Sequence, residues 1–350
     1  MQQFIESRKM QTHNKSRGQN GVRTIVITHA GCGDGAAAGA AFTKAAYDWA
    51  AAQRTAGRQT TADYDPNLLP DVDPDNLQIH STDERVFDAD KRMPDITGCI
   101  VIIVDYCYPE TTLNKLRSVA KYVRVFDHHP SRMNSLPEWM FVDQSRCAAR
   151  IVWSKLHGVE PWFIPHIEDR DLWLLDRNKF SRQFSEKFYN DGLRVGTVIK
   201  YLDYGEIEQL NHYSEGAVLM KASERNIDRI CSTAVYATFN VKGRLYNVIA
   251  VNSTQGISDV GNRLMSGIRY RNGTGPVPDF VVIYRYDIAT SQWFASLRGE
   301  GDRFNLTEIC REFGGGGHAN AAGFSYSGDF TKLLEYRRCS PPSSPSRSFA

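Results

Sequence analysis

A continuous run of six apolar residues, Cys99 to Val104, constrains the fold more than any other feature of the sequence. A short, mostly β-branched run of this kind is typical of a strand buried on both faces of a parallel sheet. Comparable strands are predicted at Thr24–Thr28 and Tyr122–Phe126, and helices over residues 36–52 and 110–120 follow the first two strands in chain order. This alternation of strand and helix predicts an α/β fold built on a parallel sheet.

Each of the three predicted strands leads directly into titratable side chains. Because the carboxyl ends of parallel strands meet at one edge of a sheet, where the sites of α/β proteins usually lie, we expect one functional site there. The glycine-containing loop after the first strand matches neither GxGxxG nor GxxxxGK[ST], which argues against a Rossmann or P-loop motif and favours a metal-binding loop. The residues concerned are His29, Cys32 and Asp34 after the first strand, Asp105 after the second, and Asp127, His128 and His129 after the third.

Some of these assignments have ordinary structural alternatives. Residues 127–129 would form a solvated turn if Pro130 only ended the strand. Asp169 and Asp171 belong to a helix predicted over 163–175, where charged residues usually make a solvated face; they do not share a face, so only one is expected to reach a site. Cys32 has the alternative of a small buried residue.

Length and composition set broader limits. A chain of 350 residues predicts two domains, and a net charge of +2 restricts any nucleic-acid contact to a local basic patch. Seven cysteines without CxxC spacing, and no apolar opening segment, favour a reducing, cytoplasmic compartment. No apolar run approaches a membrane span, and the polar ends, 1–21 and 337–350, are predicted to be disordered.

A second composition change occurs near Thr233, where short strands and helices begin to alternate again. This part ends in four glycines, 314–317, followed by His318. A glycine run after a helix is often a flexible C-cap, but a backbone without side chains also exposes N–H donors to phosphate oxygens. Arg298 offers a planar fork for bidentate phosphate contact, with a plain strand-edge arginine as the alternative.

The ordered set of these motifs, from residue 24 to residue 326, resembles the DHH phosphoesterase superfamily with its glycine-rich, DHH-associated C-terminal domain. The resemblance implies a parallel-sheet catalytic domain and a smaller α/β substrate-binding domain, with a cleft between them. The implied division is a DHH catalytic domain at 22–185, a helical connection at 186–231 and a substrate-binding domain at 232–336.

By this resemblance, two Mn²⁺ ions would be bound, with Mg²⁺ as a possible substitute. The first would be held by His29, Cys32 and Asp105, and the second by Asp34, Asp105, His128 and either Asp171, which we prefer, or Asp169. Many family members have an aspartate at the position of Cys32, whereas the branch of the family that this chain resembles has a cysteine there. Because a thiolate is softer than a carboxylate, the resemblance also allows a softer metal such as zinc or iron at the first position. Asp127 and His129 would orient His128 or the leaving group, and the substrate would contact Arg298, Gly315, Gly316, Gly317 and His318.

The function implied is a metal-dependent phosphodiesterase that converts short single-stranded oligonucleotides, or linear or cyclic dinucleotides, to 5′-mononucleotides. One alternative is a nucleic-acid-binding protein of the same fold with lost or weak catalysis, for which Cys32 is the motivating residue. Another is a hydrolase of pyrophosphate or nucleoside phosphates. The sequence leaves open RNA against DNA, substrate length and polarity, and oligomeric state.

Overall fold

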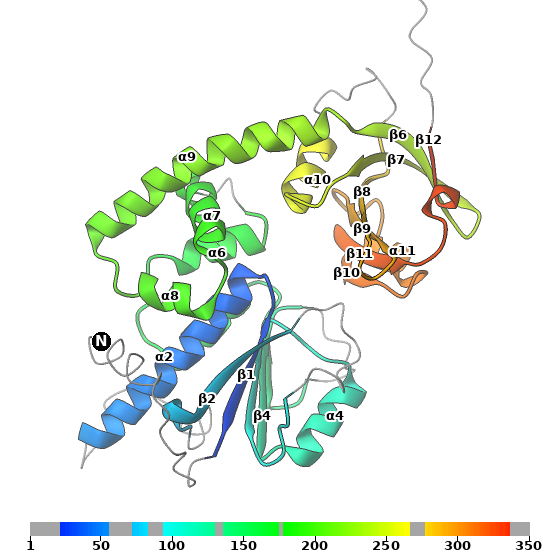
Figure 1. The fold of residues 1–350 in the computed structure, drawn as a ribbon. Helices are drawn as coiled ribbons and strands as arrows, with labels where there is room; N and C mark the ends of the chain where they lie inside the picture. Colours follow the sequence, from blue (N-terminus) through cyan, green and yellow to red (C-terminus); the bar gives the residue numbers. More distant parts are fainter. Residues whose placement is uncertain are drawn as a thin grey trace, which may run out of the picture. The chain divides into compact units, whose positions relative to one another are not determined.

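The computed structural model describes residues 22–55, 72–82, 94–129, 136–174, 178–266 and 277–336. Both ends that were predicted to be disordered lie outside these ranges. The chain divides into two compact units, Met1–Met220 and Lys221–Ala350. Each unit is built on its own sheet (Figure 1).

The first unit contains a five-stranded parallel sheet in the order β2-β1-β3-β4-β5. The strand β3 is buried at every residue, as its continuous apolar sequence predicts. The fifth strand is only three residues long and carries no periodicity that would reveal it in the sequence. The bounds are β1 Thr24–His29, β2 Leu77–Thr82, β3 Ile100–Val104, β4 Tyr122–Asp127 and β5 Met140–Val142.

Helices cover both faces of this sheet, because alternate strand residues point to opposite faces. One face packs on the alanine-rich helix α2 and on α5, and the other packs on α4 (Figure 1). The helices α6, α7 and α8 extend the hydrophobic cluster beyond α2 and α5. Gly39 allows α2 to lie close to its neighbours, since a Cβ there would be 2.8 Å from Thr28 Cγ2. The helices are α2 Gly33–Thr55, α4 Glu110–Val119, α5 Ala148–Leu156, α6 Ile164–Asp171, α7 Lys179–Asp191 and α8 Val195–Tyr201, with a 3₁₀ turn at Pro74–Asn76.

The second unit contains a seven-stranded mixed sheet in the order β10-β11-β9-β8-β7-β6-β12, in which only β7 and β8 pair in parallel. The helix α10 and the end of α9 pack on one face, and α11 packs on the other. The strands are β6 Val235–Val241, β7 Arg244–Asn252, β8 Phe280–Asp287, β9 Gln292–Arg298, β10 Gly316–His318, β11 Ala321–Tyr326 and β12 Leu334–Tyr336. The helices are α10 Ile257–Met265, α11 Leu306–Arg311 and the C-terminal part of α9 Glu206–Cys231, which begins in the first unit; a 3₁₀ turn lies at Phe330–Lys332.

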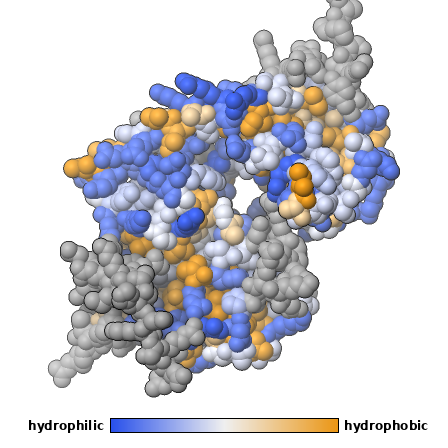
Figure 2. Space-filling model, in the orientation of Figure 1, coloured by the Kyte–Doolittle hydropathy of each residue, from blue (hydrophilic) through white to orange (hydrophobic). Residues whose placement is uncertain are grey.

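The visible surface mixes polar and apolar side chains (Figure 2). Several apolar side chains are exposed on α9, among them Ile207, Leu210 and Val218. None of the helices in the described parts of the chain combines the length and apolarity that a bilayer crossing requires.

Candidate metal centre

Three neighbouring strands of the first sheet bring their last residues to one edge. Thr28 pairs with Val104, and Val104 pairs with Phe126, so the residues that follow them lie side by side in the next row. Those residues are His29, Asp105 and Asp127. The strand ends that the sequence predicts to converge do meet, because all three strands run parallel.

Asp105 lies at the middle of this row in an unusual conformation. Its φ of 56° falls in the left-handed region, which costs a residue with a side chain about 1 kcal/mol or more and often marks a functional site. Its backbone N–H donates to the Phe126 carbonyl over 2.9 Å. The side chain is 1% exposed, and neither carboxylate oxygen receives a hydrogen bond of good geometry. Two imidazoles lie nearby, with His29 Nδ1 3.5 Å from Oδ2 and His128 Nε2 3.4 Å from Oδ1.

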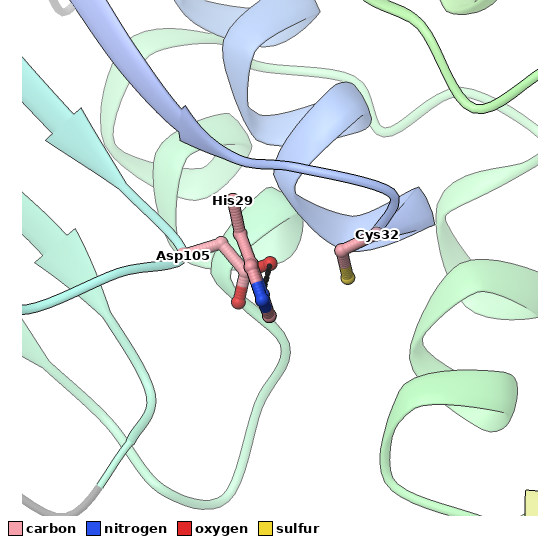
Figure 3. Close-up of side chains that lie close together, drawn as sticks. All are labelled: His29, Cys32 and Asp105. Atoms are coloured by element: carbon pink, nitrogen blue, oxygen red, sulfur yellow. Dashed lines mark ion pairs between the residues drawn. The ribbon is translucent and has the colours of Figure 1, made fainter. Parts of the chain in front are cut away.

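A first group of possible metal ligands consists of His29, Cys32 and Asp105 (Figure 3). Each offers one ligand atom, and these atoms lie within 4.8 Å of one another. Cys32 enters from the loop that joins β1 to α2, and Gly31 makes the turn of this loop with a φ of +70°. Gly35 allows the helix to approach the strand end, because a Cβ there would be 2.9 Å from the His29 carbonyl oxygen and 3.1 Å from Asp105 Oδ2.

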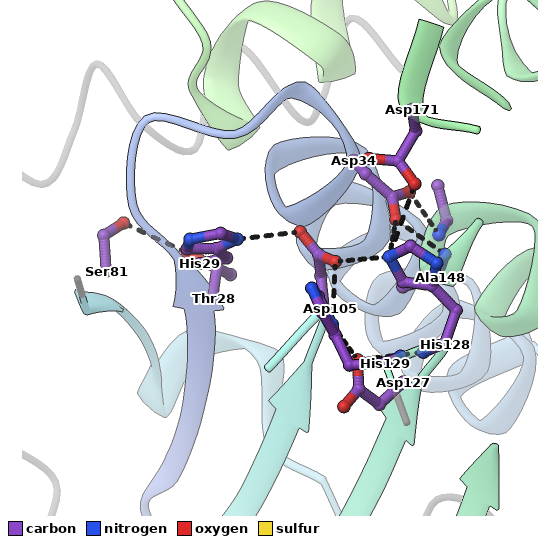
Figure 4. Close-up of polar contacts among 11 residues, drawn as sticks. Thr28, His29, Asp34, Ser81, Asp105, Asp127, His128, His129, Ala148 and Asp171 are labelled. Atoms are coloured by element: carbon purple, nitrogen blue, oxygen red, sulfur yellow. Dashed lines mark hydrogen bonds and ion pairs between the residues drawn. The ribbon is translucent and has the colours of Figure 1, made fainter. Parts of the chain in front are cut away.

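A second group consists of Asp34, His128 and Asp171, again with ligand atoms within 4.8 Å of one another (Figure 4). His128 Nε2 lies 3.3 Å from Asp171 Oδ2 and 3.9 Å from Asp34 Oδ2. The Asp34 carboxylate accepts the backbone N–H groups of Ala148 and Ala149 over 2.6 and 2.7 Å. These donors begin α5, so a helix N-terminus fixes this carboxylate. Asp105 also forms a ligand-distance group with the imidazoles of residues 128 and 129, and so it adjoins both of the first two groups.

Asp127 holds the two histidines that follow it. Its Oδ1 accepts the N–H groups of His128 and His129 over 2.8 and 3.3 Å and lies 2.7 Å from His129 Nδ1. Its other oxygen, Oδ2, is buried and receives no hydrogen bond. The carboxylate therefore positions the turn and the ring of His129.

Asp169 does not join these groups. Its Oδ2 accepts a hydrogen bond from Ser181 Oγ over 2.7 Å, and that hydroxyl also lies 2.9 Å from His166 Nδ1. Of the two aspartates on α6, the structure brings Asp171 to the cluster and directs Asp169 toward α7. The reason is helical geometry, because residues two apart point to different sides of a helix.

The cluster concentrates buried negative charge. Burial, and then the charges of Asp105 and Asp171, raise the pKa of Asp34 well above its usual value. Burial and Asp105 raise the pKa of Asp171 to about 7, and burial followed by the same negative charges raises the pKa of the Cys32 thiol. Burial alone would raise the pKa of Asp105 too, but the polar contacts with the imidazoles of His128 and His29 outweigh it, so this carboxylate stays ionised.

Among the described residues, the carboxylates of this cluster form ion pairs only with histidines and none with a lysine or arginine. Buried carboxylate oxygens without hydrogen bonds are costly unless a cation compensates them. Carboxylates and imidazoles suit Mn²⁺ or Mg²⁺, and a thiolate suits softer ions. The donor set therefore fits divalent metal binding.

In the second unit, Arg298 and His318 share one face of the sheet. Ala321 pairs with both residues, which places all three in one row across β9, β11 and β10. Arg298 lies against Gly261 of α10, where a Cβ would be 2.4 Å from its Cγ. Its Nη2 donates to Ser258 Oγ over 3.1 Å, its Nε is buried without a partner, and burial lowers its pKa.

The glycine run has two roles. Gly314, with a φ of +76°, ends α11 as a helix cap, the ordinary alternative for such a run. The next glycines belong to close strand packing. A Cβ on Gly315 would be 2.2 Å from the Gly323 carbonyl oxygen, and one on Gly317 would be 2.5 Å from that of Ala321. Gly316 pairs with Gly323 in the ladder between β10 and β11.

Sequence reasoning missed two contributors to the first site. One is Gly35, the third residue of α2, which allows the helix to approach His29 and Asp105. A glycine directly after Asp34, immediately before the predicted helix, is the sequence signal that could have revealed it. The other is the N-terminus of α5 at Ala148, whose backbone donors leave no trace in residue types.

No family model matches the chain. An uncharacterized protein of Acanthamoeba polyphaga mimivirus is 26% identical over 234 residues, which are 65% of this chain, and this chain spans only about half, 53%, of that protein. Among solved structures, the DHH domain of a protein from a family of ribosomal proteins is similar, with a TM-score of 0.53 and 13% identity over 89% of this chain and 84% of that one. RecJ from Thermus thermophilus, in complex with Mn²⁺, has a TM-score of 0.49 and 13% identity over 90% of this chain and 51% of that one. At these identities the likeness concerns the fold, and the chain has the two-part α/β fold of a DHH structure.

Proposed function

We propose that this protein is a metal-dependent phosphodiesterase that hydrolyses short oligonucleotides or dinucleotides to 5′-mononucleotides. The observation that carries the proposal is the strand-end cluster, in which Asp105 adjoins two groups of possible ligands. Its buried oxygens lack hydrogen bonds, which suits a site shaped for cations rather than a structural ion-pair network.

The residues that would hold two divalent ions are those of the two groups, with Asp105 between them. When bound, a pair of such ions polarises phosphoryl oxygens and lowers the pKa of the attacking water. The chain's own part is to keep Asp105 ionised beside His29 and His128, and to fix His129 through Asp127. Asp34 is held by the two N–H donors at the start of α5, which suits a ligand that is oriented before substrate arrives.

The second unit supplies features that suit a phosphate-bearing substrate. Arg298 presents a partly buried guanidinium with an unpartnered Nε, and His318 lies in the same row. We therefore assign catalysis to residues 22–185 and substrate holding to 232–336, joined by the helical residues 186–231. No disulfide joins the six cysteines in the described ranges, which suits a reducing compartment such as the cytoplasm.

The experiment is cleavage of 5′-labelled RNA and DNA, from two to about twenty-four nucleotides long, at increasing Mn²⁺. We expect 5′-mononucleotides from the shortest substrates, and loss of cleavage in Asp105→Ala and His128→Ala. Cys32→Asp measures what the thiol contributes to the first group. Release of phosphate from pyrophosphate without cleavage of any diester would contradict the proposal, as would single-strand binding that no metal converts to cleavage.

A further inference from the structure

Trp173 occupies a backbone conformation that tryptophan rarely adopts. Its φ is 59°, in the left-handed region that favours glycine. It follows the last turn of α6, where the Leu174 N–H donates to the Asp169 carbonyl over 2.6 Å and the Trp173 N–H donates to the Arg170 carbonyl over 3.4 Å. This is the Schellman pattern, whose left-handed position is usually a glycine. A large side chain at this position suggests that the ring has a use that offsets the strain.

The ring of Trp173 is not part of the core. The Trp173 side chain is 36% exposed. A tryptophan between two leucines, close to a site residue in the sequence, would equally suit a buried position. The Arg170 guanidinium carbon lies 4.8 Å from the Trp173 ring centroid and 5.6 Å from that of Tyr189, which is 51% exposed. A guanidinium over two rings is attracted to both and adds positive charge beside them.

Both rings belong to segments that reach the metal centre. Trp173 is two residues after Asp171, and the two are joined through the tight cap of α6. Tyr189 follows Phe188, whose Cε1 would lie 3.0 Å from a Cβ on Gly33, the residue after Cys32. The exposed pair therefore belongs to two segments of the first unit that also supply neighbours of the candidate ligands.

We propose that Trp173, oriented by Arg170 and Tyr189, is a stacking platform for a nucleobase adjacent to the phosphodiester bound at the centre. This inference rests on the proposed function and narrows its substrate class to base-bearing diesters. An aromatic face stacks on any base, and the neighbouring guanidinium complements the phosphate backbone. The platform favours nucleotides over pyrophosphate and tolerates different bases.

The test compares a dinucleotide with the same diester in which one nucleoside is replaced by its sugar without the base. We expect Trp173→Ala to lower kcat/KM for the dinucleotide by about 5- to 100-fold and to leave the abasic substrate unchanged, because only the first has a base to stack. Trp173→Phe should restore most of the loss. The matched control is Phe180→Ala, which removes a ring of similar exposure, 38%, at the opposite end of α7 from Tyr189.

A binding measurement separates this inference from the proposed function. In equilibrium dialysis with EDTA, wild-type protein should bind labelled 5′-AMP more tightly than ribose 5-phosphate, and Trp173→Ala should lose that preference. Equal binding of the two ligands by wild type, or an equal preference in Trp173→Ala, overturns the platform. If wild type cleaves no diester, the proposed function fails, and the dialysis still decides the platform.

Discussion

Replacing Asp171 by asparagine is expected to stabilise the metal-free protein. Burial and the charge of Asp105 raise the pKa of Asp171 to about 7, from an ordinary 3.8. A shift of about 3 units corresponds to at most about 4 kcal/mol of repulsion in the charged form, at 1.36 kcal/mol per unit. Because the side chain is 19% exposed and neighbouring groups relax around the charge, we expect Asp171→Asn to raise the free energy of unfolding by about 1–3 kcal/mol.

The sign follows from linkage. A carboxylate whose folded pKa is raised binds a proton in the folded state at a pH where the unfolded chain has lost it. The contribution of Asp171 to the stability of the metal-free wild type should therefore fall as pH rises from about 4 to about 7, and Asp171→Asn should remove this contribution. The difference in unfolding free energy between wild type and Asp171→Asn should be small near pH 4 and largest near pH 8.

The assay is urea unfolding in EDTA at these two pH values, followed by tryptophan fluorescence. Five of the six tryptophans lie in the first unit, so the signal reports mainly on it. The matched control is Asp191→Asn, in which Asp191 pairs with Lys187 and accepts a hydrogen bond from Tyr201 Oη over 2.8 Å. This control should lose stability. The reasoning is refuted if Asp171→Asn is less stable than wild type at pH 8, or if its effect does not change with pH.

Three further predictions concern the same unit. Burial lowers the pKa of His166 to about 4, so protonation of this histidine should remove on the order of 3 kcal/mol of stability as pH drops from about 6.5 to 4, opposite in sign to the contribution of Asp171. The difference in urea midpoint between wild type and His166→Asn should therefore change over this pH range, and a constant difference would exclude this origin. Gly35→Ala places a Cβ against the His29 carbonyl and Asp105 Oδ2, and calorimetry should show at least about tenfold weaker Mn²⁺ binding with an unchanged circular dichroism spectrum. Asp127→Asn replaces the carboxylate that orients His128 and His129, and we expect about 10- to 100-fold weaker Mn²⁺ binding by calorimetry. An unchanged affinity would show that the two histidines keep their positions without this carboxylate.

The α/β fold and the convergence of strand ends were predictable because they follow from sequence period and from the parallel direction of the strands. The run ending at Val104 is a fully buried strand, and Asp105 then emerges in the same row as His29 and Asp127. Little else is needed to place these three side chains together. The short strands β5, β10 and β12 were not predictable, since three residues carry no period.

Other features of the site depend on tertiary geometry. The sequence alone did not decide between Asp169 and Asp171, and the structure separates them through the hydrogen bond of Asp169 to Ser181. The left-handed conformation of Asp105 leaves no mark in its residue type. Trp173 is a large aromatic residue, yet it is 36% exposed at the left-handed position that ends α6, which its residue type does not reveal.

The measurement that tests the central claim most directly is Mn²⁺ binding, counted by the electron paramagnetic resonance signal of the free ion, beside dinucleotide hydrolysis in the same samples. We predict two bound ions in wild type, with hydrolysis rising as the second is bound. Cys32→Ala should lose or weaken one ion, and Asp105→Asn, which lies between both groups, should weaken both and abolish hydrolysis. Two ions bound with unchanged affinity by Asp105→Asn, or hydrolysis that persists in EDTA, would contradict the account.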